Sequence, residues 1–195
     1  MFALAGLEHG WNAATLGGPI ADAYRAASGS AVASAAKAIT SFDLGVSIAD
    51  VNAYRVQVGI EGAAGAILTD TGLRHHVSAA TIAAAAASFT GKHALAGAIT
   101  ISAAQDTGID FAQLTTSVRE TASALHVTEN AAALIVAAAA LSHTPVNDAR
   151  EAYAHMNGYF AGSDTDAATV FASYLVGDHH SPLPLYLFTS EPGED

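Results

Sequence analysis

Apolar residues recur along this chain with the spacing of helices. One stripe, with apolar positions three or four residues apart, runs from Phe111 to Leu125, and another runs from Val56 to Ile67. Between Ala131 and Leu141 every residue is apolar, which is typical of a helix buried on all sides. These patterns predict the centre of the core. The expected core residues are Phe111, Leu114, Val118, Leu134, Ile135 and Val136.

Side chains that cap helix N-termini indicate where the helices begin. Ser47, Asp110 and Ser163 each stand three positions before an acidic or amide residue, which is the spacing of a capping box. Further expected caps are Ser78, Thr128 and Thr144, the last before a proline at the first helical position. Caps and apolar spacing together predict helices at residues 19–27, 30–41, 48–68, 78–89, 93–105, 110–125, 129–142, 145–159 and 164–176.

Two segments depart from the helical pattern. Polar and apolar residues alternate from Tyr54 to Val58, so a strand is the alternative to a helix there. Near the C-terminus, Pro182 and Pro184 exclude a helix interior, and the residues between and after them are bulky and apolar. We expect residues 181–195 to form an extended arm with an acidic end.

These observations predict the fold class and the division of the chain. We expect an all-α protein, an alanine-rich bundle of about eight or nine helices, with residues 1–180 as a single domain and 181–195 as an extended C-terminal arm. About a quarter of the residues are alanine, and alanine-rich helices pack backbone to backbone at short distances. The expected core is therefore stiff.

Composition and charge narrow the set of partners. Hydrophobic residues make up 51% of the chain and charged residues only 13%, so we expect part of the surface to be buried against copies of this chain or other proteins. The 7 basic residues are scattered among 18 acidic ones, which argues against nucleic acid as a partner. The uncharged helical stretches at residues 131–142 and 77–91 are both too short for a membrane span of about 20 residues.

Several kinds of catalytic and cofactor site are disfavoured by the sequence. The chain has no cysteine, which excludes thiolate metal sites and cysteine nucleophiles. No motif for a serine hydrolase, a zinc protease or a P-loop is present. Gly59, Gly62 and Gly65 superficially suggest a dinucleotide-binding turn, but their spacing is wrong and no second strand follows, so we expect them to permit close helix packing.

Nine histidines raise the question of a metal site. His126 and Glu129 are three residues apart, and Glu151 and His155 are four apart on one helix face. Helical carboxylate–histidine pairs build di-iron sites in bundles, although the order and spacing here differ from those sites. We therefore expect no cofactor, with a metal ion at these four residues as the alternative. The doublets at residues 75–76 and 179–180 lie beside expected loops.

These features favour a structural or assembly protein over an enzyme. We expect a self-associating helical subunit of a larger particle or complex, such as a virion or a scaffold, located in the cytoplasm or within the particle. The alternative is a helical enzyme or binding protein with a buried His/Glu site for a metal or a small organic ligand. The arm presents apolar residues on both faces, which predicts contact with another chain. The expected interface residues are Pro182, Leu183, Leu185, Tyr186, Leu187 and Phe188.

Overall fold

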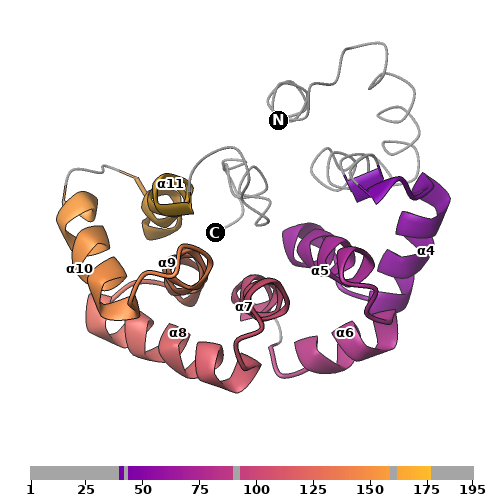
Figure 1. Ribbon diagram of the computed structural model, residues 1–195, viewed down its shortest axis with the longest axis horizontal. Coiled ribbons are helices and arrows are strands. Elements are labelled where there is room, and N and C mark those ends of the chain that lie inside the picture. The colour runs from indigo at the N-terminus through magenta and orange to yellow at the C-terminus, as the bar shows by residue number, and fades with distance from the viewer. Residues whose placement is uncertain (1–39, 42–43, 90–92, 159–161, 177–195) are drawn as a thin grey trace, which may run out of the picture. The chain divides into compact units, whose positions relative to one another are not determined.

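A computed structural model describes residues 40–41, 44–89, 93–158 and 162–176 of the chain (Figure 1). Within these residues the protein is all-α, with eight helices and no strand. The chain divides into two compact units, residues 1–85 and 86–195. The predicted helices at 19–27 and most of 30–41, and the predicted domain boundary at residue 180, lie outside the described residues.

The first unit contains α4 (Ile48–Val58), α5 (Gly62–Arg74) and most of α6 (Ala79–Ala86). Helix α4 packs on α5. The two helices approach closely where Tyr54 lies against Gly72, because a Cβ atom at Gly72 would overlap the tyrosine hydroxyl. That hydroxyl donates a hydrogen bond to the carbonyl oxygen of Val77 at 2.6 Å, and burial raises the pKa of Tyr54. Tyr54 therefore joins α4 to the chain that leaves α5.

The predicted single helix at 48–68 is wrong, because the chain turns between Val58 and Gly62. Gly59 and Gly62 both have positive φ, 72° and 65°, which the helical pattern did not reveal. The turn brings the Ile60 carbonyl so close to α5 that a Cβ atom at Gly65 would overlap it. The expectation that these glycines permit close packing is confirmed for Gly65 alone, because a Cβ atom at Gly59 or Gly62 would meet open space. The alternating segment before them is helical.

The second unit is built around α9 (Glu129–Leu141), which contacts four other helices (Figure 1). These helices are α7 (Ala94–Thr107), α8 (Phe111–Leu125), α10 (Val146–Asn157) and α11 (Asp164–Val176). Every residue of α9 from Ala131 to Ala140 is buried, as the uniformly apolar sequence predicted. Because seven of those ten residues are alanine, the neighbouring helices can approach the α9 backbone closely.

The predicted core residues are buried with one exception. Leu114 and Val118 of α8 and the three large residues of α9 are buried, whereas Phe111 is only half-buried. Phe111 is the first residue of α8, so its ring lies at the edge of the core, in an edge-on contact with Phe89 at 5.9 Å between centroids. Phe89 in turn fills the space beside Gly97 of α7 that a Cβ atom would occupy.

Six connections between helices share one local structure. In each, a residue with positive φ is followed by a β-branched residue and then by the N-cap of the next helix. The six triplets are 45–47, 59–61, 76–78, 108–110, 126–128 and 143–145. Glycine takes the left-handed position in three of them, and His76, His126 and His143 take it in the others. The β-branched residue is stiff and favours extended backbone, which suits the position between a left-handed residue and a cap.

Five of the six predicted caps are confirmed. The hydroxyls of Ser47, Ser78, Thr128 and Ser163 and the carboxylate of Asp110 each accept a hydrogen bond from a backbone N–H three residues later. Thr144 is the exception, because α10 has Pro145 at its N-cap and begins one residue later than predicted. The Thr144 hydroxyl accepts a hydrogen bond from Ser142 instead.

No individual helix among the described residues has both the length and the apolar character to cross a membrane. Helices α8 and α9 meet the requirement only when taken together, and the chain bends by 119° between them.

Candidate functional site

Among the histidine and glutamate residues that the sequence placed in pairs, Glu129 contacts a histidine outside its pair. Glu129, in the first turn of α9, contacts His93 at the start of α7, with 2.7 Å between the carboxylate oxygen and Nδ1. His126 is exposed and ends α8 with a φ of 54°. His93 was not a predicted site residue, because it lies far from Glu129 in the sequence and only the packing of α7 on α9 joins them.

The second predicted pair lies on the solvent face of α10. Glu151 and His155 are both exposed, and no described ion pair joins them. Across the ranges that the structure describes, no group of three or more histidine, aspartate or glutamate side chains is arranged to hold a metal ion. The predicted interface residues of the arm and the doublet at 179–180 lie outside these ranges.

The glycine-rich segment offers a poor environment for a phosphate group. Helix α5 begins at Gly62, where a phosphate would meet the backbone N–H groups of a dinucleotide-binding helix. The preceding residue is Glu61, whose carboxylate forms an ion pair with Arg55. The element before this helix start is helix α4 and not a strand, so the strand–turn–helix unit of a dinucleotide-binding site is missing here.

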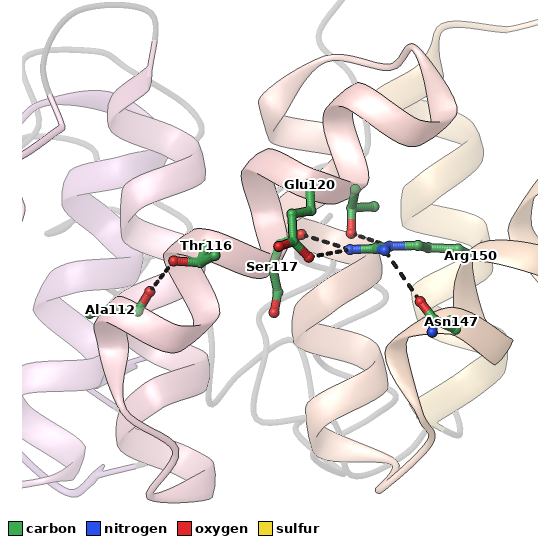
Figure 2. A network of polar contacts seen from close by, with 7 residues as sticks. Ala112, Thr116, Ser117, Glu120, Asn147 and Arg150 are labelled. Atoms are coloured by element: carbon green, nitrogen blue, oxygen red, sulfur yellow. Dashed lines mark hydrogen bonds and ion pairs between the residues drawn. The ribbon is translucent and has the colours of Figure 1, made fainter.

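A polar cluster around Arg150 is the most connected group of side chains in the second unit (Figure 2). The Arg150 guanidinium reaches from α10 to α8, where Nε donates to the hydroxyl of Thr121 at 2.8 Å. One terminal nitrogen donates to the Ser117 carbonyl oxygen at 3.3 Å and lies 3.5 Å from a Glu120 carboxylate oxygen. The other donates to the side chain of Asn147 at 3.3 Å. Thr121 is completely buried, so the arginine satisfies a polar group inside the core.

This geometry makes Arg150 a structural tie between two helices. A guanidinium has five N–H donors, and the contacts just described use four of them. Too few donors remain for the bidentate grip by which arginine holds a carboxylate or phosphate ligand. Sequence analysis missed this cluster, since a lone arginine on an exposed-looking helix carries no pattern.

A second tie holds α10 to α11. Tyr153 is buried, and its hydroxyl donates to the Asp164 carbonyl oxygen at 3.2 Å. Its ring meets Phe171 edge-on, with centroids 5.7 Å apart. Burial, and secondarily the charge of Asp164, raises the pKa of Tyr153 to about 12. The tyrosine therefore remains a neutral donor, with no role as an acid or a base near neutral pH.

The junction of α8 and α9 resembles the helix-turn-helix geometry that many DNA-binding proteins use. The two helices meet at 119° across a short turn with a left-handed residue, His126. In those proteins the second helix enters the major groove. Here that helix is α9, and its side chains from Ala131 to Ala140 face the core instead. The turn therefore serves packing.

Large apolar side chains are exposed on one face of α11. Val170 and Tyr174 are four residues apart, so they lie one turn from each other on the same face. Val170 is 46% exposed and Tyr174 is 85% exposed. Residues on the opposite face of α11, Ala168 and Ala172, are buried against the rest of the unit. We refer to Val170 and Tyr174 as the α11 face.

Comparison of the chain with protein-family models, with curated proteins and with solved structures finds no match.

Proposed function

We propose that this protein is a structural subunit that associates with copies of itself through its C-terminal region to build a larger particle or scaffold. The observation that carries the proposal is the α11 face, where Val170 and Tyr174 are exposed. An apolar segment of the sequence begins at Pro182, with five residues between it and the end of α11. Exposed apolar surface of this kind marks sites of protein–protein contact. At about 25 cal/mol per Å², its burial in a neighbouring copy drives association.

The rest of the second unit supports the same function. A central helix of alanine, leucine, isoleucine and valine gives a core of close-packed small side chains, and such a core resists deformation. Arg150 and Tyr153 fasten α10 to the helices on either side of it. A stiff unit with apolar contact surface at one end suits a role as a building block.

Native mass spectrometry of the full chain tests the proposal, because it reports stoichiometry and bound ligands together. We expect a homo-oligomer at micromolar concentrations. It is either an open assembly whose size increases with concentration or a closed oligomer of fixed size. A monomer across that range would contradict the proposal. A monomer that carries a metal ion or a small organic molecule would support the alternative, a helical binding protein or enzyme.

A further inference from the structure

We infer that the α11 face is the docking surface for residues 182–188 of a second copy of this chain. The inference rests on the proposed self-association and names the two surfaces that meet. One surface is described, namely Val170 and Tyr174 on α11. The other is the arm segment, which is the most apolar stretch of the sequence beyond α11.

The chemistry of the two surfaces is complementary. Tyr174 presents an exposed aromatic ring, and Val170 adds a branched apolar side chain one turn away. In an extended segment Leu183, Leu185 and Leu187 fall on one face, which gives three aliphatic side chains to pack on this ring and its neighbour. Tyrosine is enriched among the residues that dominate binding energy, because it buries a large area at a small cost in side-chain entropy.

The arm segment is long enough to cross the α11 face. An α-helix rises about 1.5 Å per residue, so Val170 and Tyr174, four residues apart, are separated by about 6 Å along α11. Seven extended residues at about 3.1 to 3.3 Å each would span a little over 20 Å. Residues 182–188 can therefore contact both side chains, and Pro182 and Pro184 lower the entropic cost of docking because they restrict the free segment.

Charge favours a second copy over the chain's own arm. Only five residues separate α11 from Pro182, so an arm that docked on its own helix would have to run back along it toward Asp164 and Asp166. The acidic end of the arm, with three carboxylates at residues 191–195, would then meet those two aspartates. An arm from another copy has no such constraint and can lie in the opposite direction, which keeps the carboxylates apart.

Two full-length variants test the inference by complementation. The first, Val170→Ser with Tyr174→Ser, keeps the arm and loses the α11 face. The second, Leu183→Ser with Leu185→Ser and Leu187→Ser, keeps the face and loses the arm. Val56→Ser is the matched control, because Val56 is also a large exposed apolar residue, 71% exposed, on α4. Circular dichroism checks that each variant keeps its helices.

We expect each double or triple variant to weaken self-association by about 30-fold or more, as loss of a dominant interface residue does, and the control to associate like the natural chain. Mixed at equal concentration, the two variants should form a complex that contains one copy of each, detected by sedimentation velocity with one variant labelled. The mixture should stop at that stage, because only one intact face and one intact arm remain.

The outcomes separate this inference from the proposed function. A natural chain that stays monomeric contradicts both. A natural chain that associates, with a face variant that associates equally well, overturns the inference alone. A third outcome is that the face variant and the arm variant each lose self-association and form no complex when mixed. This result would overturn the inference that the arm of a second copy occupies the α11 face, and would favour an arm that covers its own helix. A Val56→Ser chain that is weakened as much as the face variant also overturns it, since the effect would then follow any exposed apolar residue.

Discussion

Three histidines hold backbone conformations that glycine adopts at lower cost. His76, His126 and His143 have φ between 54° and 55°, in the left-handed region where a Cβ atom crowds the backbone. All three are exposed and occupy the first position of a connection that elsewhere begins with glycine. The fold therefore requires the left-handed geometry at these positions and does not require the imidazole for packing.

The first prediction follows from this strain. Substitution of His126 by glycine should raise the free energy of unfolding by about 1 kcal/mol, because the left-handed cost of a non-glycine residue is about that size. His155→Gly provides the matched control, since His155 is exposed but lies inside α10, where glycine should destabilise by about 0.5 kcal/mol. Urea unfolding followed by circular dichroism measures both. If both substitutions changed the free energy of unfolding in the same direction, the prediction would be contradicted.

Tyr153 links stability to alkaline pH. Its pKa is about 12 in the folded chain against about 10 in an unfolded one, because burial and Asp164 disfavour the phenolate. Below pH 10 both states hold the proton, so the contribution is fully present. Between pH 10 and 12 the unfolded chain ionises first, and stability is lost as the pH rises.

Removal of the Tyr153 hydroxyl should therefore have opposite effects in two pH ranges. At pH 8, Tyr153→Phe should cost about 1 kcal/mol, the usual net value of one hydrogen bond, here the one to the Asp164 carbonyl oxygen. From pH 10 to 12 the stability of the variant should fall less steeply than that of the natural chain. Urea unfolding at several pH values measures both slopes, and parallel curves would count against the raised pKa.

At the scale of helices, the sequence predicted what is encoded locally and missed what packing decides. Caps such as Ser47 and Asp110 were predictable because the acceptor and the N–H that it binds lie three residues apart. The break between α4 and α5 was missed because the apolar residues from Val56 to Ile67 keep the three- or four-residue spacing of one helix on both sides of Gly59. The turn depends on the positive φ of Gly59 and Gly62, which an apolar pattern does not encode.

The candidate site was less predictable than the fold for the same reason. The pairs chosen from sequence, His126 with Glu129 and Glu151 with His155, are close neighbours along the chain, whereas the contacts that form join different helices. Glu129 meets His93 across α7 and α9, and Arg150 meets Thr121 across α8 and α10. Such pairs are about 30 residues apart, and their spacing follows no helical period.

Arg150 carries a prediction at this scale. Arg150→Met keeps most of the side-chain volume but removes every donor to α8, so the free energy of unfolding should fall by about 1.5 to 3 kcal/mol, as for a hydrogen bond to a charged group. Arg119→Met, on the exposed side of α8, is the matched control and should change stability by less than about 0.5 kcal/mol. Thermal unfolding by calorimetry compares them. Equal losses of stability in the two variants would mean that Arg150 contributes only its positive charge and not its hydrogen bonds to α8.

At the scale of the whole molecule, charge opposes the self-association that we propose. Each copy carries a formal net charge of -11, from 18 acidic and 7 basic residues. Copies that approach one another therefore repel before their apolar surfaces meet. Repulsion between surface charges is screened over about 30 Å at 0.01 M salt and about 10 Å at 0.1 M. The salt concentration therefore shifts the balance between charge repulsion and apolar contact without any change in the sequence.

The last prediction is that added sodium chloride strengthens self-association. Between 0.01 and 0.1 M salt at pH 8, the dissociation constant of the natural chain should fall several-fold, because screening removes repulsion while the apolar contact at Val170 and Tyr174 persists. Sedimentation equilibrium measures the constant, and the Val170→Ser, Tyr174→Ser chain should remain weakly associated at both concentrations. An assembly held by ion pairs would loosen as salt is added, so weaker association at 0.1 M would exclude an apolar interface between these acidic copies.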